Sequence, residues 1–131
     1  MGTASSKPTI ALIVEDEFLV RMVAADIFTD AGFEAIEAAN ADEALLILES
    51  RRDIGVIFTD INMPGSIDGL SLAYVVSRRW PSIRIIVTSA LRIPGNRALP
   101  AGSMFLEKPY QSSHIAGAVR ALTRSSAWSA L

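Results

Sequence analysis

Short apolar runs alternate with helix-like stretches along almost the whole chain, and this alternation constrains the fold most strongly. Most runs are rich in β-branched residues, as strands are, and they cover residues 9–14, 33–38, 54–59, 83–87 and 104–106. Strands that alternate with helices form a parallel sheet through right-handed crossovers. The sequence therefore predicts a three-layer α/β domain, with a parallel five-stranded sheet and helices on both faces.

Apolar side chains recur at helical spacing between these runs. The predicted helices span residues 18–31, 41–48, 72–80 and 115–122. Asn40 is suited to cap the second of them, with Glu43 three residues later as its capping-box partner. Pro81 ends the third helix, because the residue before a proline disfavours helical geometry.

The segment of residues 91–102 is the least regular part of the chain. Pro94, Gly95, Pro100 and Gly102 rule out a long helix there, so we expect the fourth helix to be shortened or irregular. A chain of 131 residues has the size of one domain. The predicted organisation is a flexible leader at residues 1–7, one domain over residues 8–124 and a short C-terminal tail at residues 125–131.

Composition excludes several classes of function. The net charge is −2 with no basic block longer than two residues, which argues against direct nucleic-acid binding. The chain has no cysteine and a single histidine, His114, so thiolate and multi-histidine metal sites are excluded. No apolar run approaches the roughly twenty residues of a membrane span. We therefore expect a cytoplasmic protein without a membrane partner.

Polar residues follow the predicted strands. They are Glu15 and Asp16 after the first strand, Asp60 after the third, Thr88 and Ser89 after the fourth, and Lys108 after the fifth. Open α/β sheets bind ligands at the carboxyl ends of their strands, and in the strand order 2-1-3-4-5 the first and third strands are neighbours there. Three carboxylates repel one another unless a cation is present, and an all-oxygen ligand set favours Mg²⁺.

A divalent cation beside a carboxylate, a hydroxyl group and a lysine is suited to phosphoryl transfer. Asp60 is the candidate nucleophile, because a carboxylate can form an acyl phosphate. Mg²⁺ would cancel charge on the incoming phosphoryl oxygens, and Lys108 would hold one of these oxygens as a point charge.

Four motifs resemble the receiver domain of two-component response regulators, a CheY-like family. They are IVEDE at residues 13–17, FTDINMPGSIDGL at residues 58–70, TSA at residues 88–90 and LEKPY at residues 106–110. Each motif is weak alone, but four in this order at these spacings are specific. The resemblance covers about residues 8–124 and implies a flavodoxin-like (βα)5 fold with strand order 2-1-3-4-5.

The resemblance also implies a role for each matching residue. Asp60 matches the phosphoacceptor, and Glu15 with Asp16 matches the acidic pair of the Mg²⁺ site, in which Asp16 is the direct ligand. Asn62 matches the residue whose backbone carbonyl completes the metal shell. Lys108 matches the lysine of the site, and its bond to Pro109 is cis in the family.

The matching switch residues are a hydroxyl residue and an aromatic residue. Thr88 and Ser89 both carry a hydroxyl group, and we assign the switch to Ser89 because a small residue, Ala90, follows it. Thr88 then points to the opposite face of the strand. Phe105 matches the aromatic switch residue. The loop of residues 64–69 is one residue longer than the shortest form in the family, and the irregular fourth helix puts output through that helix in doubt.

The expected function is that of a stand-alone receiver, since about seven residues follow the last predicted helix. It would accept a phosphoryl group from a histidine kinase or a histidine phosphotransfer protein and signal by contact with a downstream protein, as a monomer or weak dimer. It would not be an enzyme, apart from slow loss of its own phosphoryl group. The alternatives are a binding module that is not phosphorylated and a small phosphohydrolase, although Asn62 stands where such hydrolases place a second acid.

Overall fold

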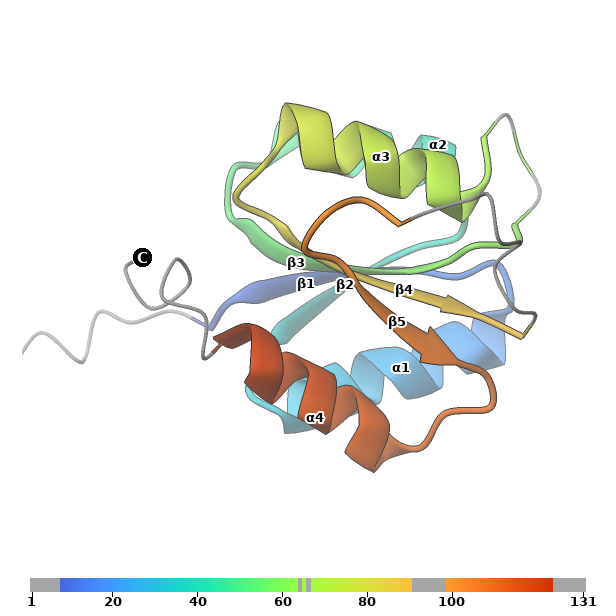
Figure 1. The fold of residues 1–131 in the computed structure, drawn as a ribbon, viewed down its shortest axis with the longest axis vertical. Coiled ribbons are helices and arrows are strands. Elements are labelled where there is room, and N and C mark those ends of the chain that lie inside the picture. Colours follow the sequence, from blue (N-terminus) through green and yellow to red (C-terminus); the bar gives the residue numbers. More distant parts are fainter. Residues whose placement is uncertain (1–7, 64, 66, 91–98, 124–131) are drawn as a thin grey trace, which may run out of the picture.

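The computed structural model describes residues 8–63, 65, 67–90 and 99–123. Five parallel strands form one sheet in the order β2-β1-β3-β4-β5, which confirms the predicted α/β fold and strand order (Figure 1). The strands are β1 (Ile10–Val14), β2 (Glu34–Ala38), β3 (Ile54–Asp60), β4 (Arg84–Ser89) and β5 (Met104–Glu107). The helices within the described ranges are α1 (Phe18–Asp30), α2 (Ala41–Ser50), α3 (Gly69–Arg79) and α4 (Ser112–Thr123).

The sheet separates two hydrophobic cores. Helices α2 and α3 cover one face, where Leu12 of β1 and Ile57 of β3 lie in the same buried cluster as Leu72 of α3 (Figure 1). Helices α1 and α4 cover the other face, where Phe58 packs against Phe28 with ring centroids 5.4 Å apart. Successive side chains of a strand point to opposite faces, so each central strand contributes to both cores.

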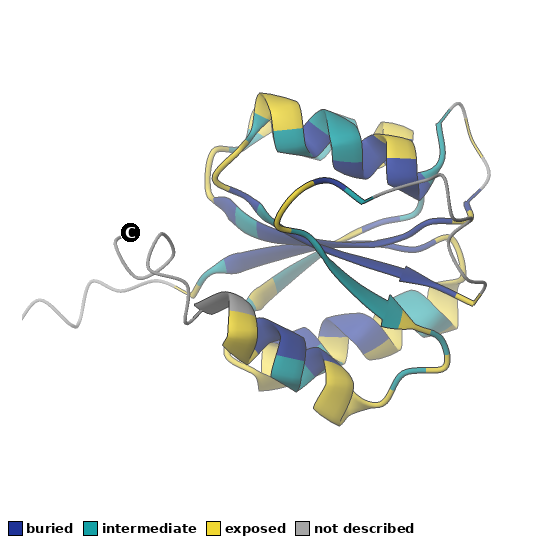
Figure 2. Ribbon diagram, in the orientation of Figure 1, coloured by how far each residue is buried: buried dark blue, intermediate teal, exposed yellow. Residues whose placement is uncertain are grey.

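Burial follows the position of each strand in the sheet. Every residue of β1 is buried, whereas β2 and β5 at the two edges are partly exposed (Figure 2). A parallel strand covered on both faces is a continuous apolar run, and an edge strand is more polar. This difference explains why β2 alternates weakly in the sequence.

Side-chain caps set the starts of α2 and α3. The Oδ1 atom of Asn40 accepts a hydrogen bond from the Glu43 N–H at 2.8 Å, as the motif predicts. The Glu43 carboxylate accepts from the N–H of Ala39 at 2.6 Å, one residue before the cap. Helix α3 begins at Gly69, three residues before the predicted start, because Asp68 caps it by accepting from the Ser71 N–H at 2.8 Å.

Two strands extend further than their apolar runs. Asp60, Thr88 and Ser89 are the last residues of β3 and β4, and not the first residues after them. Asp60 is paired with Thr88, and the N–H of Ile61 donates to the Thr88 carbonyl at 2.9 Å. Pairing with neighbouring strands therefore outweighs the low strand propensity of aspartate.

Three expectations fall largely outside the described residues. These are the leader, the C-terminal tail and the irregular fourth helix, most of which falls on residues 91–98. The described end of that segment forms a turn, in which Gly102 has a φ of +82° and the Ser103 N–H donates to the Pro100 carbonyl at 3.1 Å. Within the described ranges, no helix combines the length and apolar character that crossing a membrane requires.

Candidate functional site

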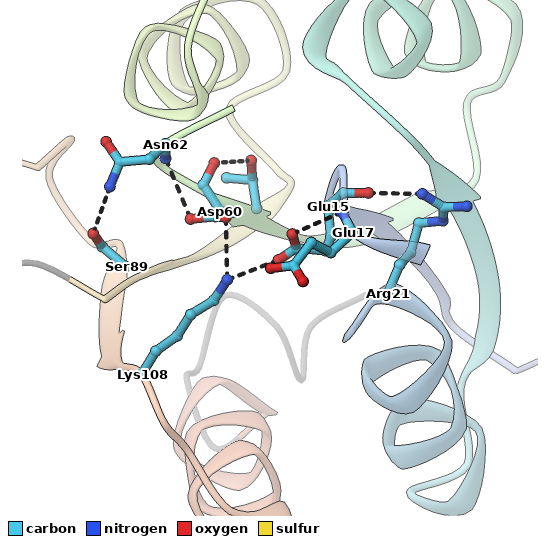
Figure 3. A network of polar contacts seen from close by, with 8 residues as sticks. Glu15, Glu17, Arg21, Asp60, Asn62, Ser89 and Lys108 are labelled. Carbon is cyan, nitrogen blue, oxygen red and sulfur yellow. Dashed lines mark hydrogen bonds and ion pairs between the residues drawn. The ribbon is translucent and has the colours of Figure 1, made fainter. Parts of the chain in front are cut away.

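Polar side chains from four strands meet at the carboxyl edge of the sheet. Glu15 directly follows β1, Asp60 ends β3, Ser89 ends β4, and Lys108 directly follows β5. The side chain of Lys108 reaches between those of Asp60 and Glu15 (Figure 3). The parallel sheet therefore gathers residues that lie far apart in the sequence.

Lys108 forms ion pairs with two buried carboxylates. Its Nζ atom lies 2.9 Å from Oε1 of Glu15 and 3.1 Å from Oδ2 of Asp60. Burial lowers the pKa of Lys108, but the hydrogen bonds to Glu15 and Asp60 outweigh that effect and raise the pKa overall. The ammonium group therefore stays charged at the centre of the site.

The acidic side chains outnumber the cation that faces them. Glu15, Asp16 and Asp60 each offer a carboxylate oxygen, and these three oxygens lie within 4.8 Å of one another. Burial raises the pKa of Glu15 and the charge of Asp60 raises it further, while Lys108 and the Glu17 N–H oppose the rise. A divalent cation would supply the missing positive charge, and this all-oxygen donor set fits Mg²⁺.

Asn62 connects Asp60 to Ser89. Its backbone N–H donates to Oδ1 of Asp60 at 3.2 Å, and its side-chain amide donates to the Oγ atom of Ser89 at 3.0 Å (Figure 3). Together with Lys108 at Oδ2, the Asn62 N–H orients the Asp60 carboxylate through both of its oxygens. The sequence pointed only to the backbone carbonyl of Asn62, so its side-chain contact is an additional finding.

The two adjacent hydroxyl groups have different surroundings. Strand alternation places Ser89 on the same face as Val87, which packs with the α2 and α3 core, and Thr88 on the opposite face. The Oγ1 atom of Thr88 is buried and has no hydrogen-bond partner among the described residues. Phe105 is half-buried against the same core as Val87, with which it is paired across the sheet. Ser89 and Phe105 therefore share a face.

The segment after β5 is anchored beside the site. The peptide bond between Lys108 and Pro109 is cis. Tyr110, two residues after Lys108, packs its ring edge-on against Phe58 with centroids 5.6 Å apart. Phe58 lies two residues before Asp60, so the segment carrying the lysine packs on the strand that carries the aspartate.

Gly69 allows α3 to start directly against the site. A Cβ atom at this position would lie 1.6 Å from the backbone oxygen of Asp60, so any side chain there would force the backbone to shift. The Gly69 N–H donates to the carbonyl of Ile61 at 2.8 Å. Sequence reasoning did not single out this glycine, although its place at the end of the loop after Asp60 was a usable signal.

Arg21 is a second residue that the sequence did not single out. It lies on α1, and its guanidinium group donates to the backbone carbonyl of Glu15 at 2.8 Å. Spacing along the chain offered no signal for this contact, because it depends on how α1 returns over the end of β1.

Comparisons with known proteins agree with this geometry. Residues 11–120 match the family model of the response regulator receiver domain. The chemotaxis protein CheY of Thermotoga maritima is 33% identical over 119 residues, covering 86% of this chain and 96% of that protein. A putative NtrX-like response regulator of Rickettsia bellii is 32% identical over 108 residues, covering 79% of this chain but only 22% of that much longer protein.

A solved structure shows the same fold. It is that of the response regulator protein TrrA from Thermotoga maritima in complex with Mg²⁺–BeF, with a TM-score of 0.78 and 24% identity, covering 87% of this chain and 98% of that one. The family model matches most of the chain, and the CheY relative matches over nearly its whole length. The chain therefore belongs to the response regulator receiver domain family of two-component signalling.

Proposed function

We propose that this receiver domain accepts a phosphoryl group on Asp60 from a phosphohistidine of a histidine kinase or a histidine phosphotransfer protein. The observation that carries the proposal is the contact of Asp60 with the Lys108 ammonium at 3.1 Å, within a cluster of three carboxylates. Carboxylates held this close together repel one another, and binding of a cation relieves this repulsion. The motifs shared with the family support the same assignment.

The transfer exchanges one phosphorus bond for another. A carboxylate oxygen of Asp60 attacks the phosphorus, the bond to the histidine nitrogen breaks, and its electron pair stays on the imidazole. Asp60 becomes an acyl phosphate. Lys108 and the Asn62 N–H hold the carboxylate in one orientation before the attack, and such positioning lowers the barrier.

The remaining residues receive the phosphoryl group. Lys108 holds one phosphoryl oxygen as a point charge. The Ser89 hydroxyl holds another after it leaves Asn62, and Phe105 turns inward on the face that it shares with Ser89. These two roles follow the family pattern, and the contact of Ser89 with Asn62, which also contacts Asp60, supports the role of Ser89.

Mg²⁺ belongs to this proposal as the resident cofactor. Glu15, Asp16 and Asp60 would hold it together with the backbone carbonyl of Asn62. When bound, it neutralises charge that builds on the phosphoryl oxygens. The complex of TrrA with Mg²⁺–BeF indicates that this fold accommodates such a group.

An apolar surface on α1, next to a groove that reaches Lys108, supports a protein as phosphodonor or as downstream partner. Phe18, Leu19, Met22 and Val23 of α1 are all exposed, and we call them the α1 patch. Leu19 and Val23 also line a groove of about 540 Å³ that extends to Lys108. Several apolar side chains exposed on one helix are typical of a surface that contacts another protein.

Labelling with acetyl phosphate tests the acceptor site without any partner protein. We expect Mg²⁺-dependent, acid-stable and base-labile labelling of the wild-type chain, and none in Asp60→Asn. Asp26→Asn is a matched control, because Asp26 is an exposed acid on α1 and this variant should be labelled like the wild type. Labelling that persists in Asp60→Asn would refute the assignment of Asp60.

The two alternative functions, a binding module and a phosphohydrolase, predict other results. A binding module that is not phosphorylated would show no labelling and no spectral change with beryllofluoride and Mg²⁺. A phosphohydrolase would turn over external phosphate esters in many cycles, which requires a general acid that Asn62 cannot provide.

A further inference from the structure

The side chain of Arg21 joins strand β2 to the loop that carries the acidic pair. Its Nη1 atom donates to the backbone carbonyl of Glu15 at 2.8 Å (Figure 3). Its Nε atom donates to Oε1 of Glu37 at 3.0 Å. The Arg21 side chain is only 15% exposed and its contact with the Glu15 carbonyl is partly buried, whereas the Glu37 side chain is 40% exposed. A planar guanidinium group can satisfy two acceptors in one fixed geometry, which an ammonium group does less well.

The carbonyl of Glu15 depends on this contact because β2 ends too early to pair with it. Val14 and Ala38 form the last residue pair of β1 and β2, and the Glu15 N–H still donates to the Ala38 carbonyl at 3.1 Å. The next position on the β2 side is taken up by the start of α2, where Asn40 is the cap. Arg21 supplies the donor that the sheet does not.

The first turn of α1 holds the other end of the short loop through backbone contacts that do not depend on the Arg21 side chain. The backbone N–H of Arg21 donates to the Glu17 carbonyl at 2.9 Å, while the Glu17 N–H donates to Oε2 of Glu15 at 3.1 Å. Asp16 is exposed and lies between these two anchored residues. The peptide group that joins Glu15 to Asp16 is therefore fixed by Arg21 from the side of α1.

We propose that Arg21 is a positioning residue of the cation site, which holds the Asp16 carboxylate against Asp60 by fixing the Glu15 carbonyl, with Glu37 holding the guanidinium in place. The inference rests on the proposed Mg²⁺-dependent function. Residues that orient metal ligands typically change metal affinity by about tenfold or more when they are removed.

The sign of the effect separates this role from a purely electrostatic one. If Arg21 acted only through its positive charge, removing that charge would strengthen Mg²⁺ binding at a nearby acidic cluster. If Arg21 positions the loop, its removal weakens binding although a repulsive charge is lost. Arg21→Lys then falls between the wild type and Arg21→Ala, because lysine keeps the charge without the fixed pair of donors.

The experiment is a calorimetric Mg²⁺ titration of wild type, Arg21→Ala, Arg21→Lys and Glu37→Gln, with Arg79→Ala as the matched control. Arg79 also has one acidic partner, Glu49 at 3.1 Å, and one aromatic neighbour, but it lies away from the loop. We expect the Kd for Mg²⁺ to rise about tenfold in Arg21→Ala, less in Arg21→Lys and Glu37→Gln, and not in Arg79→Ala.

A second measurement needs no metal. In EDTA, amide hydrogen exchange at Asp16 and Glu17 should become faster in Arg21→Ala while the amides of β3 keep their protection. A Kd for Arg21→Ala that is unchanged or lower, with unchanged exchange in the loop, would overturn the inference. If Arg21→Ala does not fold, Arg21→Lys and Glu37→Gln decide by the same criteria. A wild-type chain that binds no Mg²⁺ would instead refute the proposed function.

Discussion

Phe58 and Asp60 lie two residues apart on β3 and are almost equally buried, with exposures of 2% and 5%, yet their surroundings are opposite. Phe58 is enclosed by the rings of Phe28 and Tyr110, whereas Asp60 is enclosed by an ammonium group and two other carboxylates. Along β3, the surroundings of the side chains thus change from aromatic to charged within two residues, which is one repeat of the side-chain alternation. Burial alone does not tell which residues stabilise the fold.

The largest effect on stability is expected for Phe58→Ala. Truncation removes two aromatic contacts and leaves a cavity, so the free energy of unfolding should fall by about 3–5 kcal/mol. Urea unfolding measures this change. Phe18→Ala is the matched control, since Phe18 is 61% exposed and its truncation should cost less than about 0.5 kcal/mol. Similar losses in the two variants would contradict the assignment of Phe58 to the core.

Gly69→Ala should have the next largest effect, because its Cβ atom would collide with the Asp60 backbone. We expect a loss of about 1–3 kcal/mol, as for other overpacked sites, together with weaker Mg²⁺ binding. Gly117→Ala is the control: a Cβ atom there meets nothing within 4 Å, and helical alanine should add about 0.5–1 kcal/mol. Thermal unfolding of both variants measures the two changes in Tm. Changes of the same sign would contradict the prediction that Gly69→Ala destabilises the protein and Gly117→Ala stabilises it.

Asp60→Asn should affect stability much less than Phe58→Ala, although we expect it to abolish labelling. Lys108 loses one partner but keeps Glu15 at 2.9 Å, and Glu15 loses a neighbouring like charge. These effects oppose each other, so the free energy of unfolding without Mg²⁺ should change by no more than about 1 kcal/mol. A loss as large as that of Phe58→Ala would show that Asp60 is chiefly a structural residue.

The smallest change in stability is expected for Leu19→Ala. This variant tests whether an exposed residue can matter for function without contributing to stability. Leu19 and Leu46 are exposed by 67% and 68%, and truncation of either should change stability by less than about 0.5 kcal/mol. Only Leu19 belongs to the α1 patch. Phosphoryl transfer from a cognate histidine protein should therefore slow several-fold in Leu19→Ala alone, with acetyl phosphate labelling unchanged in both. Equal transfer rates would argue against docking on α1.

Much of the fold was predictable because the relevant signals are local. Hydrophobic runs indicated all five strands, and Asn40 with Glu43 indicated the start of α2. The predicted start of α3 was wrong by three residues, since the apolar pattern begins at Leu72 whereas the cap is Asp68. The ends of β3 and β4 were also predicted too early, because pairing between Asp60 and Thr88 depends on neighbouring strands.

The main residues of the candidate site were also predictable from the sequence, but the contacts that support them were not. Acidic and basic residues at strand ends, together with the family motifs, indicated Asp60, Glu15 and Lys108, and the structure brings these side chains into contact. The supporting contacts of Arg21 and of the Asn62 amide were not predictable. Both join segments whose approach is set by the tertiary fold, and neither spacing nor composition reports such an approach.

The contact between Gly69 and Asp60 bears on how the loop after Asp60 tolerates a change in its length. The loop that follows Asp60 has both of its ends pinned, since the Gly69 N–H bonds to the Ile61 carbonyl and the Gly69 Cα lies against the Asp60 backbone. Insertions between two ends held in this way cost little closure entropy, and we expect them to leave the Asp60 carboxylate in place. We therefore expect variants with a longer or shorter loop to keep the same geometry at Asp60.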